Sequence, residues 1–166
     1  MSGLWDNPRM NGIRVRDYAE ADAAPTLQVF RDAVTVTASQ RYTAEQITAW
    51  AGPPEDDLPG WHAARTSRAT IVAVVGDQVA GFSDVDPTGY IDMLFVSPEF
   101  GRRGVASRLL DEIESRARAS GLGSLTVSAS LLLRPLLERR GFVVETQLSP
   151  EINSVTLISF AMRKDL

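Results

Sequence analysis

The amino-acid sequence predicts one mixed α/β domain, in which a mostly antiparallel central sheet is flanked by helices. Segments whose apolar residues recur at every second position alternate with segments whose apolar residues recur at helical spacing. Three consecutive strand-like segments are separated only by short turn signals. The chain has 166 residues, of which 44% are hydrophobic, so it is long enough to bury one sizeable core.

The N-terminal end is expected to lie outside this domain. Residues 1–11 are polar and contain a turn signal at Asn7-Pro8, which is typical of a flexible lead-in. The predicted domain therefore covers residues 12–166. Its first strand is expected at residues 13–16, where apolar and charged side chains alternate.

Three helices are predicted after this strand. Apolar residues recur at helical spacing over residues 21–37. Thr43 is a predicted N-cap, and Gln46 three residues later completes a capping box for a helix that runs to about Trp50. A further short helix is predicted over residues 58–66.

Strand signals dominate the middle of the chain. Residues 71–75 and 78–85 flank Gly76-Asp77, which is a two-residue hairpin signal. A second turn at residues 86–89 leads into a third strand at residues 90–96. The simplest arrangement of these three strands is an antiparallel meander.

The C-terminal part begins with the clearest helix of the sequence. Residues 104–120 carry one apolar face and end at Gly121, a natural helix stop. No internal repeat or long linker divides the chain. The remaining predicted elements are a strand at 124–129, a short helix at 131–140, and closing strands at 142–144 and 155–162.

The reactive side chains exclude several classes of site. The chain has no cysteine and one histidine, His62. A cysteine nucleophile, a disulfide scaffold, a zinc finger and an iron–sulfur site are therefore excluded. A centre built from several histidines is also impossible, and we expect no metal.

The net charge and hydropathy narrow the expected partners. The net charge of −4 at pH 7 argues against a general nucleic-acid-binding protein. No apolar run approaches the length of a membrane span, and the N-terminus lacks an apolar signal core. We therefore expect a cytoplasmic protein that binds neither nucleic acid nor membrane.

The most informative segment is residues 90–106, where a predicted strand enters a turn rich in Gly and Arg that opens the long helix. Free N–H groups and the dipole of a helix N-terminus form an anion site. Gly101 and Gly104 allow a ligand to approach the backbone, and Arg102 and Arg103 add positive charge. The alternative is a helix that merely begins with glycines and carries solvated arginines. The segment matches neither a P-loop nor a dinucleotide fingerprint.

This segment resembles motif A of the GCN5-related N-acetyltransferases, the GNAT superfamily. Gly104 and Ala106 match the fourth and sixth positions of the signature Q/R-x-x-G-x-G/A, whereas Gly101 stands where Gln or Arg is usual. Residues 79–82 resemble the family's "v-v-G-f" strand, and residues 136–142 resemble its closing "F-Y-E-R-x-G-F". Residues 42–50 are similar to a segment of an uncharacterised bacterial branch. The four segments follow the family's order, and the resemblance extends from Ile13 to Lys164.

The resemblance implies a GNAT-like fold, acetyl-CoA binding and direct acetyl transfer to a primary amine in a ternary complex. The pantetheine arm would pair like an extra strand with Leu94, Phe95 and Val96, and an N–H near Leu94 would donate to the thioester oxygen. Ser130 stands where many members have an Asn that touches the cofactor. The pyrophosphate would bind the backbone amides of Arg102, Arg103, Gly104, Val105, Ala106 and Ser107.

The resemblance also names candidates for proton transfer. An alkyl-ammonium must lose a proton before it attacks, and Asp92, which alternation places on one strand face with Tyr90 and Leu94, is the candidate base. Its alternative role is a polar lining of the substrate groove. Leu137 stands where members often have a Tyr that donates a proton to the departing CoA thiolate. Tyr42 and Tyr90 are therefore the candidates for this general acid. Tyr42 could instead line the acceptor pocket or pack against Trp50.

The acceptor remains open between a small molecule and a protein amine. The competing functions are a catalytically silent acyl-CoA-binding module, which the missing Tyr at Leu137 favours, and an unrelated phosphate-binding domain. A homodimer is plausible because family members often pair through C-terminal strands. Residues 155–162 are apolar on both faces from Thr156 onward, as a buried strand or an interface would be.

Overall fold

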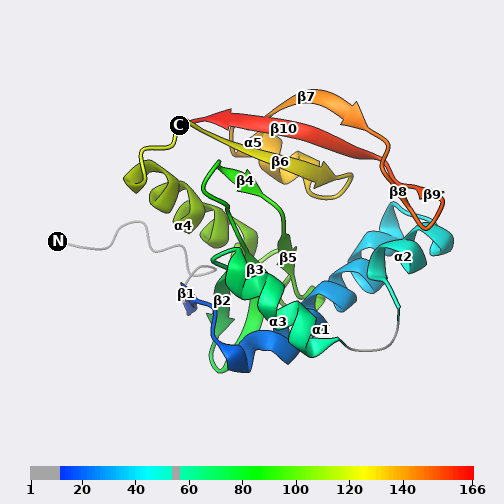
Figure 1. Ribbon diagram of the computed structural model, residues 1–166, viewed down its shortest axis with the longest axis horizontal. Coiled ribbons are helices and arrows are strands. Elements are labelled where there is room, and N and C mark those ends of the chain that lie inside the picture. Colours follow the sequence, from blue (N-terminus) through cyan, green and yellow to red (C-terminus); the bar gives the residue numbers. More distant parts are fainter. Residues whose placement is uncertain (1–11, 54–56) are drawn as a thin grey trace.

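A computed structural model describes residues 12–53 and 57–166 of the chain. The predicted lead-in of residues 1–11 lies outside the described residues. Figure 1 shows two groups of strands with the helices packed around them. The helices are α1 (Ala23–Asp32), α2 (Ala44–Ala51), α3 (Leu58–Ser67), α4 (Val105–Ala119) and α5 (Arg134–Arg139).

The strands form two four-stranded sheets and a small hairpin. The sheet orders are β1-β2-β3-β5 and β4-β6-β10-β7, and β8 pairs with β9. The strands are β1 (Ile13–Asp17), β2 (Ile71–Val75), β3 (Gln78–Ser83), β4 (Tyr90–Ile91), β5 (Leu94–Val96), β6 (Ser124–Ser130), β7 (Val143–Leu148), β8 (Glu151–Ile152), β9 (Val155–Thr156) and β10 (Ser159–Asp165).

The predicted hairpin and meander are confirmed. β2 and β3 pair antiparallel around Gly76-Asp77, with Val75 opposite Gln78. β3 pairs antiparallel with β5, which completes the meander. The only parallel pair among the described strands joins β4 to β6, so the mixed and mostly antiparallel character of the fold is confirmed as well.

The prediction of one continuous strand over residues 90–96 is wrong. The segment divides into β4, which pairs with β6, and β5, which pairs with β3. Between them, the amides of Asp92 and Met93 donate to the side chain of Asp84 rather than to a strand. This break shifts the alternation by one residue, so Ile91 and Leu94 face the same core, and Asp92 does not share a face with Leu94.

Two other elements differ from the sequence-based prediction. A single helix was expected over residues 21–37, but the α-helical part ends at Asp32. The chain then forms a π-helical turn (Ala33–Thr37) and a 3₁₀ turn (Ala38–Gln40). The strand expected at residues 155–162 divides into β9 and β10, because the chain first folds back on β8. The capping box of Thr43 and Gln46 is present as predicted.

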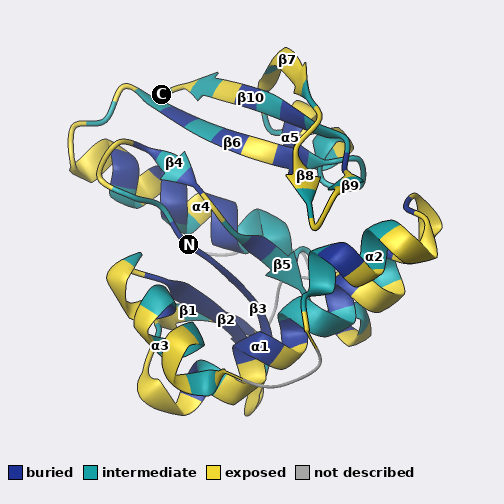
Figure 2. Cartoon of the chain, turned by 45° about the vertical axis from the view of Figure 1, so that its right-hand side comes forward, coloured by how far each residue is buried: buried dark blue, intermediate teal, exposed yellow. Residues whose placement is uncertain are grey.

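Two hydrophobic clusters form layers on the two faces of the β1-β2-β3-β5 sheet, and a third, smaller cluster contains Ala38, Tyr42 and Leu157. α4 contributes Leu109, Leu110 and Ile113 to the larger layer, whereas α1 and α3 cover the opposite face. Figure 2 shows β2 and β3 buried between these layers. Gly81 allows this close packing, because a Cβ atom there would lie 2.8 Å from the backbone oxygen of Phe95. None of the helices in the described residues has the length and apolar character of a membrane span.

Candidate active site

The two sheets separate where the chain passes from β4 to β5. Ile91 pairs with Val127 of β6, but Leu94, three residues later, pairs with Ser83 of β3. Beyond Val127, β6 continues to Ser130 and pairs only with β10 on its other side. A cleft therefore opens between β5 and the end of β6, with one edge of each strand facing into it.

The edge of β5 that faces this cleft carries unpaired backbone groups. The Asp84 N–H donates to the Met93 carbonyl at 3.3 Å, and the Ser97 N–H donates to the Ala80 carbonyl at 2.8 Å. Hydrogen-bonded and non-hydrogen-bonded pairs alternate along an antiparallel ladder. Phe95 therefore bonds to β3, and the N–H and C=O groups of Leu94 and Val96 point into the cleft.

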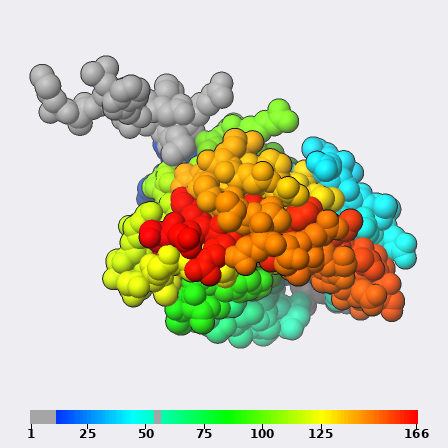
Figure 3. Space-filling view, turned by 90° about the horizontal axis from the view of Figure 1, so that it is seen from above, coloured from blue at the N-terminus to red at the C-terminus, as the bar shows by residue number. Residues whose placement is uncertain are grey.

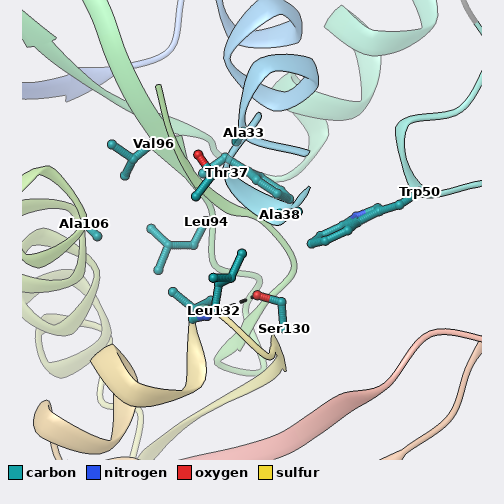
Figure 4. Close-up of a pocket in the computed structure, with 11 residues that line it drawn as sticks. Ala33, Thr37, Ala38, Trp50, Leu94, Val96, Ala106, Ser130 and Leu132 are labelled. Carbon is teal, nitrogen blue, oxygen red and sulfur yellow. Dashed lines mark hydrogen bonds between the residues drawn. The ribbon is translucent and has the colours of Figure 1, made fainter. Parts of the chain in front are cut away.

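An apolar cavity of about 150 Å³ occupies the cleft. Figure 4 shows Trp50 directed toward it from one side and Leu94 and Leu132 from the other. Thr37 contributes a hydroxyl to its wall, and the remaining side chains are mostly apolar. The lining residues are Ala33, Thr37, Ala38, Trp50, Leu94, Phe95, Val96, Ala106, Ser130, Leu132 and Leu133.

The turn before α4 leads from this cavity to a cluster of free amides. Arg102 and Gly104 have φ angles of 60° and 86°, so the backbone is left-handed at both positions. The first helical bond runs from the Arg108 N–H to the Gly104 carbonyl at 3.0 Å. Among the described residues, no acceptor bonds to the backbone amides of residues 102–107. This arrangement can bind an anion such as a phosphate.

The side chains of this turn agree with an anion site. Arg102 and Arg103 are exposed, and within the described part of the chain neither forms an ion pair with an acid. The Arg103 guanidinium lies 5.4 Å from the centre of the Phe100 ring. Val105 is buried in the core, so it can contribute only its backbone amide.

Ser130 lies on the wall of the cleft opposite β5, and Leu137 lies behind that wall. The Ser130 Oγ lines the cavity and accepts a hydrogen bond from the Leu133 N–H at 3.2 Å, which fixes the turn into α5. Leu137 is fully buried in the core. It has no ionisable group and does not reach the cavity.

Asp92 and Tyr90 form a second group beside the strand break. The Asp92 side chain is 41% exposed, and its Oδ2 lies 3.7 Å from the Arg68 Nε. Tyr90 is half-buried, and burial together with the charge of Asp92 raises the pKa of its phenol. Neither side chain is among those that line the apolar cavity.

Tyr42 lies behind the cavity, where its hydroxyl joins three segments. It donates to the Ile158 carbonyl and accepts from the Leu131 N–H, both at 2.9 Å. Its ring packs edge-on against Trp50 with the ring centres 5.4 Å apart. Burial raises the pKa of this phenol. Of the alternatives for Tyr42, the packing against Trp50 is therefore present.

Sequence reasoning missed several residues of the site. Thr37 and Ala38 were expected at the end of a helix or beyond it, and the π-helical turn brings this segment to the cavity. Phe95 was predicted to pair with the pantetheine arm, but its place in an aromatic wall with Trp50, with ring centres 6.1 Å apart, was not. The buried Asp84 was also missed, although an acid within an apolar strand is a signal of a buried ion pair.

Comparison with known proteins identifies the family of this arrangement. The model of the acetyltransferase (GNAT) domain matches residues 35–166. The chain belongs to the GNAT acetyltransferase family. The uncharacterized N-acetyltransferase YafP of Escherichia coli (strain K12) is 39% identical to it over 155 residues, which cover 93% of this chain and 97% of YafP.

Solved structures share the fold of this GNAT acetyltransferase. A GCN5-related N-acetyltransferase from Rhodopseudomonas palustris has a TM-score of 0.89 and 31% identity, and the match covers 95% of this chain and 98% of that one. The PaiA N-acetyltransferase of Thermoplasma acidophilum, crystallised with coenzyme A, has a TM-score of 0.74 at 17% identity, over 93% of this chain and 99% of its own. The predicted family and fold are thereby confirmed.

Proposed function

We propose that this GNAT acetyltransferase binds acetyl-CoA in the cleft between β5 and β6 and transfers the acetyl group directly to a primary amine in a ternary complex. One observation carries the proposal: unpaired backbone amides follow the cleft from the open edge of β5 to the N-terminus of α4. An extended ligand that ends in a pyrophosphate has the shape and charge to use both. The structures of PaiA with coenzyme A and of the Salmonella typhimurium YncA with acetyl-CoA support it by analogy of fold.

Different backbone groups of the chain suit the pyrophosphate and the pantetheine arm of acetyl-CoA. The amides of residues 102–107, with Arg102 and Arg103 beside them, suit the pyrophosphate. The free groups of Leu94 and Val96 suit the amides of the pantetheine arm, which would pair as an additional strand. Ala106 and Ser130 would line the arm on its two sides. When bound, acetyl-CoA supplies the activated acetyl group.

The residues near the acetyl group have distinct proposed roles. The Leu94 N–H, which points into the cleft, would donate to the thioester oxygen and stabilise negative charge on it. Asp92, two residues earlier and partly exposed, would take a proton from the ammonium group of the acceptor, directly or through water. Tyr90 would donate a proton to the departing thiolate: burial raises the pKa of its phenol, which is therefore protonated at neutral pH but is a weaker acid than a free phenol.

Tyr42 is the other proposed proton donor, and it also retains its proton at neutral pH. Its hydroxyl hydrogen is engaged by the Ile158 carbonyl, which favours a positioning role over a catalytic one. The acceptor is a small molecule or a protein amine. If no amine is acetylated, the chain is a silent acyl-CoA-binding module, a function that the buried Leu137 favours.

A thermal-shift titration tests the binding part of this proposal. Acetyl-CoA should raise the melting temperature in proportion to the logarithm of its concentration once the site is saturated. The variant Gly104→Glu should abolish this shift, because its carboxylate would repel the pyrophosphate. Gly121→Glu is a matched control, since Gly121 also has a left-handed φ of 78° but lies at the other end of α4. No shift at millimolar acetyl-CoA would contradict the proposal.

A thiol-release assay with a panel of amines tests the transfer step. Turnover with one amine excludes the silent module. A thermal shift without turnover on any amine favours it.

The proposal extends to location and assembly. We propose that the domain of residues 12–166 acts in the cytoplasm, where acetyl-CoA is available, and that it forms a homodimer through its C-terminal strands. Figure 3 shows β7 and β10 spread over one face of the molecule. β7 lies at the edge of its sheet, and Val143 on it is 62% exposed. An open strand edge with an exposed apolar side chain supports pairing with a second copy.

A further inference from the structure

A buried carboxylate occupies the break between β4 and β5. Asp84 follows directly on β3, and its side chain has no exposed surface. Its Oδ1 accepts hydrogen bonds from the Asp92 N–H at 2.8 Å and the Met93 N–H at 3.3 Å. These are the two residues at which the chain leaves β6 for β3, so one oxygen atom binds both amides of the break.

Two arginines from α3 and the turn after it hold this carboxylate. The Arg65 Nη1 lies 3.4 Å and the Arg68 Nε 3.2 Å from the Asp84 Oδ2. Arg65 is buried, and its guanidinium lies 4.6 Å from the centre of the Trp61 ring. The Arg68 Nη2 also donates to the Asp84 Oδ1 at 3.3 Å, so this oxygen accepts from one guanidinium as well as from the amides of Asp92 and Met93.

Arg68 also binds the chain on the β4 side of the break. Its Nη2 donates to the Tyr90 carbonyl at 3.3 Å, and its Nε lies 3.7 Å from the Asp92 carboxylate. Asp84 and Arg68 together therefore bond to the backbone at residues 90, 92 and 93. These bonds satisfy polar groups of the backbone where the chain passes from the β6 ladder to the β3 ladder.

The position of the cleft depends on these bonds. Consecutive N–H groups of a regular strand point to opposite edges, so a continuous strand could direct only one of these two amides to β6. Asp84 accepts from both amides with one oxygen, which holds the chain in its irregular path between the two ladders. The break directs β5 to β3 and leaves the Leu94 N–H facing the cleft. Asp84 itself does not line the cavity.

We propose that Asp84 is a positioning residue for acetyl transfer: its buried carboxylate holds the strand break that opens the cleft and directs the Leu94 amide into it. The proposal rests on the proposed function for the identity of the ligand. The break itself is a property of the free protein, and it can be measured without any ligand.

Two double variants with the same charge test the proposal. Arg65→Met with Asp84→Asn, and Arg65→Met with Asp84→Leu, both remove one buried cation and one buried anion. Asn retains an oxygen that can accept from the two amides, whereas Leu has a similar size and no acceptor. In the free proteins, we expect the Asp92 and Met93 amide protons to exchange with solvent about tenfold or more faster in the Leu variant. Equal exchange rates would overturn the proposal.

Acetyl-CoA binding and kinetics provide the second readout. We expect the Asn double variant to bind acetyl-CoA within about threefold of the wild type, and the Leu double variant to bind about tenfold or more weakly. The KM for acetyl-CoA should rise more than kcat falls, because Asp84 sets the cleft and moves no proton. Equal affinities in the two variants would count against the proposal.

Controls separate this inference from a general loss of stability and from failure of the proposed function. Asp86→Asn alters a neighbouring carboxylate that accepts from the Thr88 and Tyr90 amides outside the break, and it should leave acetyl-CoA affinity unchanged. If the Leu variant does not fold, Arg65→Met with Asp84→Ser takes its place, since Ser is too short to reach the two amides. If the wild type binds no acetyl-CoA, the proposed function fails, and the amide exchange alone decides the role of Asp84.

Discussion

At the scale of single residues, two polar side chains behind the cavity form hydrogen bonds with backbone groups and so position the segments around it. Tyr42 satisfies a partly buried amide and a partly buried carbonyl with one hydroxyl, and so fixes the turn before α5 relative to the residue before β10. Asp84 satisfies two amides with one oxygen and fixes the strand break. Both residues shape the wall of the cleft without lining the cavity, which is why neither role could be read from residue type alone.

The variant Tyr42→Phe should lower the free energy of unfolding by about 1–3 kcal/mol, because it leaves the Leu131 N–H and the Ile158 carbonyl without a partner. Urea denaturation measures this change. Tyr18→Phe is the control, since the Tyr18 hydroxyl bonds the His62 ring and no backbone group, and its cost should be smaller. If Tyr42 donates the catalytic proton, kcat falls and its pH profile changes. Unchanged stability would contradict the bridging role.

Asp22 makes the stability of the fold depend on pH. Burial alone would raise the pKa of this carboxyl, but hydrogen bonds from Arg16 and the Ala19 N–H outweigh it and hold the pKa below its ordinary value. A lowered pKa stabilises the fold fully above the unfolded value of about 3.9, and this contribution is lost as the pH falls through the folded value.

Unfolding by urea between about pH 6 and about pH 3 should therefore show a smaller loss of stability in Asp22→Asn than in the wild type. The Asn side chain keeps the shape of Asp22 and removes its charge. Parallel curves for the two proteins over this range would show that Asp22 does not contribute to the pH dependence.

At the scale of elements, the packing of β3 against β5 and α4 depends on a missing side chain. A Cβ atom at position 81 would lie 2.8 Å from the Phe95 oxygen and 3.0 Å from the Val105 Cγ1. Gly81→Ala should therefore displace β5 or α4 and lower the free energy of unfolding by about 1–3 kcal/mol. Because β5 lines the cleft, acetyl-CoA affinity should fall as well.

Gly123→Ala is the matched control for this change, because nothing lies within 4 Å of a Cβ atom there. Its effect on stability should stay within about 0.5 kcal/mol. Chemical denaturation of both variants checks the prediction, and an equal effect at the two positions would contradict it.

The sequence predicted the elements of the fold better than their pairing. The hairpin at Gly76-Asp77 and the helix that became α4 follow from local turn and periodicity signals, and both are present. The break at Asp92 could not be seen, because its acceptor is the side chain of Asp84 and its stabilising cations come from α3 and the turn after it. Interactions between distant segments leave no periodicity in the sequence.

At the scale of the whole molecule, the two sheets are joined by the broken strand, and the cleft lies where they part. The β8–β9 hairpin extends from the second sheet to α2, where the Gln46 Nε2 donates to the Thr156 carbonyl at 3.0 Å. Figure 1 shows this hairpin beside α2 at one end of the molecule. The two sheets that form the walls of the cleft are thus connected at the strand break, and the second sheet also contacts α2 through this hairpin.

The proposed homodimer is a prediction at this scale. Pairing along β7 would bury Val143, so Val143→Glu should dissociate the dimer into monomers while leaving each chain folded. Size-exclusion chromatography with light scattering measures the mass of both proteins against the 18.1 kDa of one chain. A wild type that is monomeric at micromolar concentration would contradict the dimer.

The sequence by itself determined the class of the fold and the family, and it predicted the anion site at the start of α4, because each of these depends on residues close together in the chain. Gly101, Arg102, Arg103 and Gly104 are consecutive, and the helix dipole follows from their place before α4. Only the tertiary structure decided where the strand breaks, which edge of β5 stays open and which side chains line the cavity. Those features depend on buried charges and hydrogen bonds between segments up to 116 residues apart, and such contacts form only when the chain is folded.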